Sequence, residues 1–167
     1  MTDAPPLQNL WYLAGLSREV RAGAMLRRTL FGEPVALGRT AGGAAFALRD
    51  VCPHRAAPLS AGRVTGEAVE CPYHAWRFGA ADGRCVSVPA LPANDARDFS
   101  GLRVARYALA EANGLIWIWY GAGEPLQASP DVGLPPQSAP KTLTVVETEG
   151  PFDEAVVGLV DPAHTPT

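Results

Sequence analysis

The sequence predicts an all-β body, and three observations carry this prediction. The 17 glycines and 16 prolines exceed the usual combined share of about 12% of residues. They separate short apolar runs, which is the pattern of many short strands joined by turns. Asp82-Gly83 and Asn113-Gly114 are dipeptides that favour hairpin turns. A chain of 167 residues is long enough for one domain with a substantial core and part of another.

The first half of the chain predicts four strands. Residues 10–16 are apolar at consecutive positions, as in a buried strand or an arm packed on the body. Three further strands are expected at residues 25–31, 34–39 and 44–49. Thr-Ala-Gly-Gly at residues 40–43 favours a hairpin turn between the last two. The fourth strand then leads directly to Cys52.

The second half predicts shorter strands and more turns. Residues 63–70 are expected to form one short strand that leads to Cys71. A hairpin is expected from residues 76–78 and 84–88, with its turn at 80–83. After a Pro- and Ala-rich loop at 89–100, the last hairpin pairs residues 102–110 with 115–120 across a turn at 111–114.

Residues 121–140 contain five prolines and three glycines, which predicts a linker. Alternating β-branched residues at 141–148 then predict a strand. A helix is expected over residues 151–160, because Pro151 suits an early helical position and Asp153 and Glu154 suit the first turn.

The most informative residues are four potential metal ligands in two short motifs. Cys52-Pro-His54 is followed by sixteen residues and then by Cys71-Pro-Tyr-His74. A zinc ion can use two Cys and two His ligands, but in the common zinc-finger sequence the two Cys come together and the two His come together. The interleaved order here suits a two-metal cluster in which each loop gives its Cys to one iron and its His to the other. This is the arrangement of a Rieske 2Fe-2S centre.

The mixed ligand set has a chemical purpose. Two thiolates and two neutral imidazoles leave the oxidised cluster formally uncharged, whereas four thiolates leave it with two negative charges. Rieske potentials therefore lie at about −150 to +300 mV, against about −400 mV for plant-type clusters with four Cys ligands. A zinc-binding interaction module stays the alternative on spacing alone.

Three neighbouring residues have weaker predictions attached. Trp76 is expected to shield the cluster from water, which also tunes its potential. Arg55 lies beside His54 and is either a solvated charge or a residue for docking or electron transfer. Cys85, the third cysteine of the chain, is expected to be a buried packing residue.

Composition excludes several classes of function. A net charge of −3 gives no basic footprint for nucleic acid or for anionic membranes. The cysteine count argues against a disulfide framework and suits a reducing compartment. Residues 1–9 lack the basic and apolar regions of a leader, and no run approaches the 18 apolar residues of a membrane span. The expected location is the cytoplasm.

The motifs together resemble the large (α) subunit of Rieske non-haem iron aromatic-ring oxygenases. The resemblance is carried by residues 52–60, by Cys-Pro-Tyr-His-Ala-Trp at 71–76 and by Gly-Leu-Val-Asp-Pro-Ala-His at 158–164. It implies a Rieske fold of stacked antiparallel sheets with two cluster-binding loops over residues 1–122. A linker at 123–140 and the strand-helix start of an α+β catalytic domain at 141–167 would follow.

The same resemblance implies a second metal site in the intact protein. His164 resembles the first His ligand of a mononuclear Fe(II). Asp161 resembles the carboxylate that links this iron to the cluster of a neighbouring subunit. The second His and the carboxylate ligand would fall after Thr167. We therefore expect the sequence to be the front part of an oxygenase, unable by itself to complete the mononuclear site.

The family also implies partners. Electrons would come from a reductase or ferredoxin, and O2 would be used to hydroxylate or demethylate a small aromatic-type substrate. The intact protein would be a homotrimer. A free-standing Rieske ferredoxin is the second hypothesis. Such carriers end soon after the last hairpin, so residues 121–167 count against it.

Overall fold

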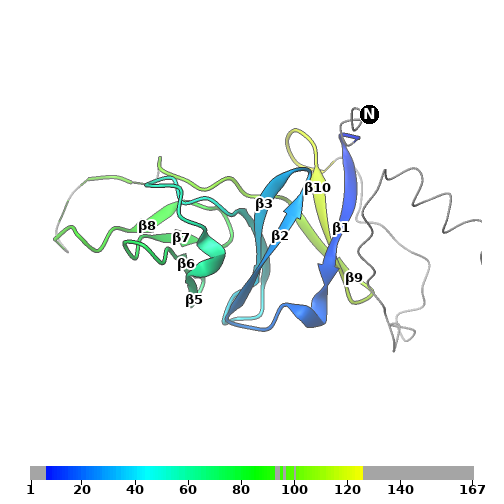
Figure 1. Ribbon diagram of the computed structural model, residues 1–167, viewed down its shortest axis with the longest axis horizontal. Coiled ribbons are helices and arrows are strands. Elements are labelled where there is room, and N and C mark those ends of the chain that lie inside the picture. Colours follow the sequence, from blue (N-terminus) through cyan, green and yellow to red (C-terminus); the bar gives the residue numbers. More distant parts are fainter. Residues whose placement is uncertain (1–6, 93–94, 96, 100, 126–167) are drawn as a thin grey trace, which may run out of the picture. The chain divides into compact units, whose positions relative to one another are not determined.

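The computed structural model describes residues 7–92, 95, 97–99 and 101–125 (Figure 1). All of them belong to one compact unit, Pro6–Ala139. This described part contains ten strands, two short 3-10 turns and no α-helix, which confirms the all-β prediction. The strand expected at 141–148, the helix expected at 151–160 and most of the linker lie outside the described residues.

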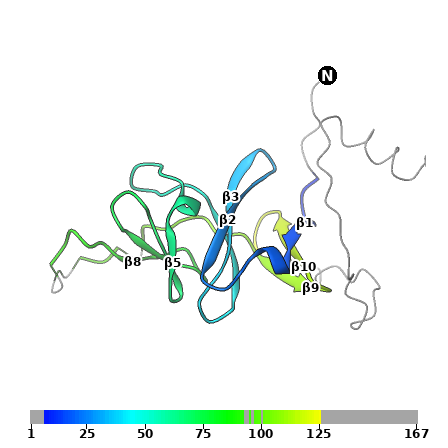
Figure 2. The same cartoon turned by 60° about the horizontal axis from the view of Figure 1, so that its bottom comes forward.

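The ten strands form three antiparallel sheets, which Figures 1 and 2 show from two directions. The first has the order β1 (Leu10–Leu16), β10 (Leu115–Tyr120), β9 (Leu109–Ala112). The second has the order β2 (Ala24–Leu30), β3 (Glu33–Arg39), β4 (Ala45–Arg49). The third has the order β5 (Arg63–Thr65), β6 (Ala68–Glu70), β7 (Arg77–Gly79), β8 (Cys85–Ser87). The 3-10 turns are η1 (Ser17–Glu19) and η2 (Leu59–Ala61).

Most expected strands are confirmed within a residue or two, but the single strand expected at 63–70 is wrong. The chain turns at Gly66, which has φ +60°, so that β5 and β6 form a hairpin with Arg63 opposite Glu70. Glycine adopts this left-handed backbone without steric cost. The segment is thus two strands of three residues each.

The last hairpin also differs from the prediction. Residues 102–108 form only isolated bridges, Arg84 with Arg103 and Leu48 with Arg106, and β9 begins at Leu109. The turn is Asn113-Gly114, where both residues have positive φ, as a type I′ turn requires. Glu111 and Ala112, expected in the turn, belong to β9 and pair with β10.

The unit has two hydrophobic cores, and β4 contributes to both. Phe46 and Leu48 belong to one core, while Ala47 between them belongs to the other. This follows from the strand period of two, which sends successive side chains to opposite faces. The first core also holds Cys52, Cys71, Phe78 and Cys85. The two cysteines expected to bind metal, Cys52 and Cys71, are therefore anchored in this core.

Gly38 of β3 is required by the ring of its cross-strand partner Phe46. The two residues are paired in the β3–β4 ladder. A Cβ atom at position 38 would lie 2.2 Å from Cζ of Phe46 and within 3 Å of two more ring atoms. The ring thus covers the bare glycine backbone, as aromatic residues do in other sheets.

We expect Gly38→Ala to lower the free energy of unfolding by about 1–3 kcal/mol, because the added methyl group displaces a buried ring. Urea denaturation followed by circular dichroism measures this change. Gly101→Ala is the matched control, since its Cβ would meet nothing within 4 Å, and it should change stability by less than about 0.5 kcal/mol. Equal losses in both variants would contradict the packing argument.

Candidate metal centre

Two six-residue loops, Cys52 to Ala57 and Cys71 to Trp76, have the same backbone. In the first, the Cys52 N–H donates to the Ala57 carbonyl at 2.9 Å, and the Ala56 N–H donates to the Cys52 carbonyl at 2.9 Å. In the second, the Cys71 N–H donates to the Trp76 carbonyl at 2.8 Å, and the Ala75 N–H donates to the Cys71 carbonyl at 3.1 Å. Each loop is therefore closed by the same pair of hydrogen bonds.

The fifth residue of each loop has an unusual conformation. Ala56 and Ala75 both have φ +55°, in the left-handed region that costs a residue with a Cβ roughly 1–2 kcal/mol. Strain of this kind persists where the surrounding structure imposes it, often at functional sites. The same strained position in both loops indicates that the loop shape itself is required.

Because the loops match position by position, their histidines occupy different places. His54 is the third residue of its loop and His74 is the fourth of the other. The equivalent places hold Tyr73 and Arg55. Sequence reasoning identified the four potential ligands, but it did not reveal that Tyr73 and Arg55 are the counterparts of the two histidines.

The two thiols are buried and adjacent. Cys52 is 2% exposed and Cys71 is 3% exposed. Burial raises the pKa of the Cys52 thiol, as does the Cys71 thiol within hydrogen-bonding reach, while the backbone N–H groups of His54 and Arg55 point at its sulfur and lower the pKa. A bound metal ion would deprotonate both thiols outright, and the two N–H groups would then stabilise the thiolate.

The two imidazoles lie at the surface, and each contacts an aromatic ring from the second loop. Their ring centroids are 4.8 Å apart. His54 stacks on Trp76 at 4.5 Å with an angle of 9° between the planes. His74 lies 3.8 Å from the exposed Tyr73 ring. The pKa of His54 is lowered by partial desolvation and by the charges of the neighbouring His74 and Arg55. A lower pKa favours the neutral imidazole, which is the form that binds metals.

A buried carboxylate anchors the entrance to each loop. Asp50 accepts hydrogen bonds from the Ser60 N–H and hydroxyl, both at 2.6 Å, which ties together the two ends of the segment that contains the first loop. Glu70, next to Cys71, pairs with Arg63 at 2.5 Å and Arg77 at 2.8 Å. The Arg77 hydrogen bond and the nearby guanidinium charges lower the pKa of Glu70. Neither carboxylate was identified from the sequence.

The donor set fits a two-iron cluster better than a single zinc ion. One tetrahedral zinc would need four donors around one point. The site instead offers a pair of buried thiols and a pair of surface imidazoles, as a cluster with two protein ligands per iron requires.

The other predicted residues have mixed outcomes. Cys85 is 6% exposed and belongs to the first core, which confirms its packing role. Trp76 packs against the same core and stacks on His54, and its role in shielding a cluster stays a prediction. Asp161 and His164, expected at a second iron, lie outside the described residues.

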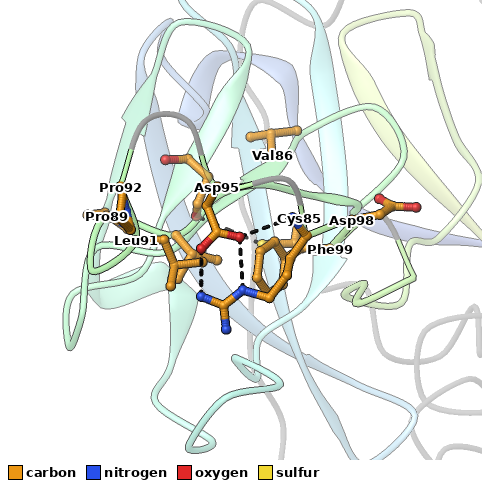
Figure 3. A pocket seen from close by; sticks show the side chains of 11 residues that line it. Cys85, Val86, Pro89, Leu91, Pro92, Asp95, Asp98 and Phe99 are labelled. Atoms are coloured by element: carbon orange, nitrogen blue, oxygen red, sulfur yellow. Dashed lines mark hydrogen bonds and ion pairs between the residues drawn. The ribbon is translucent and has the colours of Figure 1, made fainter.

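A separate cavity of about 540 Å³ lies between β8 and the described residues of the following segment, 88–92, 95 and 97–99 (Figure 3). Its walls are mixed: apolar residues such as Val86, Leu91 and Phe99 line it together with the Asp95–Arg97 ion pair. Cys85 lines it, but none of the four potential ligands does.

None of the described helical turns has the length and apolar character of a membrane-spanning helix.

Comparison with known proteins gives a specific match. Residues 10–108 match the Rieske [2Fe-2S] domain family. Among curated relatives, chloroplastic chlorophyllide a oxygenase of Chlamydomonas reinhardtii is 35% identical over 162 residues, which are 96% of this chain and 24% of that protein. The chain spans about a quarter to a third of the length of such relatives.

Solved structures agree. Dicamba monooxygenase with non-haem iron and dicamba is 40% identical with a TM-score of 0.65, covering 78% of this chain and 39% of that one. The oxygenase in the reduced oxygenase–ferredoxin complex of carbazole 1,9a-dioxygenase is 30% identical with a TM-score of 0.63, covering 71% and 30%. The family match over residues 10–108 includes both loops described above.

We expect Trp76→Ala to accelerate the loss of bound iron severalfold, because His54 loses the ring that covers one of its faces. Bleaching of the visible absorbance in the presence of a chelator measures this rate. Trp76→Phe keeps an aromatic face and should stay close to the wild-type rate. A wild-type rate in the alanine variant would contradict a shielding role.

Proposed function

Because this chain belongs to the Rieske [2Fe-2S] domain family, we propose that Cys52, His54, Cys71 and His74 hold its cluster and that the domain transfers electrons for an oxygenase. The pairing of two buried thiols with two surface imidazoles carries this proposal. When bound, a cluster of this kind accepts and releases one electron. The remaining task of the protein is to hold the cluster, to set its potential and to control access to it.

The residues around the centre divide these tasks. Cys52 and Cys71 anchor the cluster in the core, where their thiolates are kept from water. His54 and His74 form its solvent edge, which is the shortest route for an electron between the cluster and a partner. Trp76 fixes the plane of the His54 ring by stacking. Asp50 and Glu70 hold the loops in place through Ser60, Arg63 and Arg77.

For the whole protein we propose oxygenase activity. The relatives named above are oxygenases, one of them solved with non-haem iron and dicamba. His164 would be a ligand of the mononuclear Fe(II), and Asp161 would connect that site to the cluster of a neighbouring subunit. The reaction class is hydroxylation or oxidative demethylation of a small aromatic-type substrate with O2.

The partners follow from the same reasoning. A reductase or ferredoxin would supply electrons, as the solved oxygenase–ferredoxin complex illustrates for carbazole 1,9a-dioxygenase. Three identical subunits would assemble if Asp161 of one subunit meets the cluster of the next. We propose the cytoplasm as its location, because a chain whose cysteines would be two cluster ligands and one packing residue suits a reducing compartment.

We expect His74→Cys to lower the reduction potential by on the order of 100 mV, because a thiolate replaces a neutral ligand. A potentiometric titration followed by electron paramagnetic resonance (EPR) measures it. Cys85→Ser is the control and should keep both the signal and the potential. An unchanged or raised potential in the first variant, or loss of iron in the second, would overturn the ligand assignment.

A further inference from the structure

Each cysteine loop is preceded by a buried carboxylate, but the two carboxylates differ in how their charge is balanced. Glu70 contacts two guanidinium groups directly, those of Arg63 and Arg77. The side chain of Asp50 is 0% exposed, and both of its hydrogen bonds at 2.6 Å come from the neutral Ser60. The entrance to the first loop therefore carries a buried negative charge that no described guanidinium contacts at hydrogen-bonding distance.

The ion pair that Asp50 does form is weak. Nε of Arg27 lies 3.7 Å from Oδ2 of Asp50, and the Arg27 side chain is 60% exposed. Water and salt screen a pair of this kind, so its energy is small. Each oxygen of Asp50 accepts a hydrogen bond from Ser60, as an ionised carboxylate does. These hydrogen bonds stabilise the charge without cancelling it.

Asp50 also lies close to the candidate metal centre. It precedes Cys52 by two residues, and two residues of extended chain span at most about 7 Å. Asp50, Cys52 and the nearby Leu59 are each at most 2% exposed, so protein and not water surrounds them. A charge in such surroundings acts on its neighbours more strongly than a charge in water does.

The sign of its effect on a cluster follows from the charge of the electron. Reduction adds one negative charge to the cluster, and a fixed carboxylate nearby raises the free energy of the reduced form more than that of the oxidised form. The reduction potential therefore falls. At an effective dielectric constant of about 20 and a separation of about 10 Å, one unit charge changes the equilibrium constant for one-electron reduction by roughly tenfold.

We propose that the buried charge of Asp50 lowers the reduction potential of the cluster that the two loops hold. This inference rests on the proposed function of the site. It goes beyond the role of Asp50 in closing the first loop, because a neutral acceptor at this position would also bind Ser60. The consequence is a reduced cluster that gives up its electron more readily and needs a stronger reductant to load it.

Asp50→Asn tests the charge with almost no change in shape. The amide oxygen still accepts from the Ser60 N–H, and the amide NH2 donates to the Ser60 hydroxyl. A redox titration of the cluster-loaded chain at one fixed pH, followed by visible absorbance, measures the equilibrium constant for reduction. We expect this constant to rise about tenfold. An unchanged or lower constant would overturn the proposal.

Arg27→Gln changes the charge balance in the opposite direction. It removes the positive charge of the same ion pair and leaves the buried carboxylate in place. Because Arg27 is largely exposed, the variant should fold normally, and the constant should fall about twofold. This variant decides the question if Asp50→Asn fails to bind iron. A rise in both variants would indicate a loosened loop and would contradict an effect of charge.

Two control variants separate the charge of Asp50 from packing and from net charge. Ser60→Ala removes one hydrogen bond and keeps the carboxylate, so it should lower the free energy of unfolding and leave the constant within about twofold of wild type. Glu111→Gln removes a carboxylate of β9 that pairs with Arg39 and should leave the constant unchanged. Figure 1 shows β9 at the opposite end of the unit from β6 and β7, which flank the second loop. A tenfold rise in either control would overturn the assignment to Asp50.

The EPR spectrum of the reduced protein distinguishes this inference from the proposed function. A Rieske-type signal in wild type and variants shows that the cluster is bound, and the redox titrations then decide the role of Asp50 alone. If the wild type lacks this signal, the proposed cluster ligation fails, and the inference fails with it.

Discussion

The structure depends on the pair of backbone hydrogen bonds that closes each cysteine loop. In each loop the Cys N–H donates to the carbonyl five residues later, and the Cys carbonyl accepts from the N–H four residues later. The loop closed in this way holds its alanine at φ +55°. The hydrogen bonds direct each thiol inward and the rest of each loop outward. Because the same closure occurs twice, the two loops together present thiols to the core and imidazoles to solvent, which is the separation that an electron-transfer centre needs.

The surrounding sheets serve this arrangement. β6 ends at Glu70 and β7 begins at Arg77, and the ion pair between these residues closes the base of the second loop. Asp50 closes the base of the segment that holds the first loop through Ser60. Breaking a buried pair by removing one partner is costly because the other charge is left uncompensated. The two carboxylates therefore hold the two loops in place through contacts with protein groups alone.

Much of this could be predicted from the sequence, and the remainder shows where sequence reasoning ends. The interleaved order of Cys52, His54, Cys71 and His74 indicated the metal chemistry because ligand type and spacing are local properties. The hairpin at Gly66 was missed because a lone glycine in a short run does not distinguish a turn from a weak strand. Nothing about alanine indicates a left-handed backbone, although the shared pattern Cys-Pro-x-x-Ala in both loops was a signal that the two loops are alike. The stacking of Trp76 on His54 and the burial of Asp50 depend on contacts between separate segments.

The central claim is that two thiols and two imidazoles from these loops hold a cluster of two irons. The most direct test is the iron and acid-labile sulfide content of protein purified without air, together with the EPR spectrum after reduction by dithionite. We predict about two irons and two sulfides per chain, with a Rieske-type signal. One zinc ion per chain without sulfide, or a signal typical of four thiolate ligands, would contradict it.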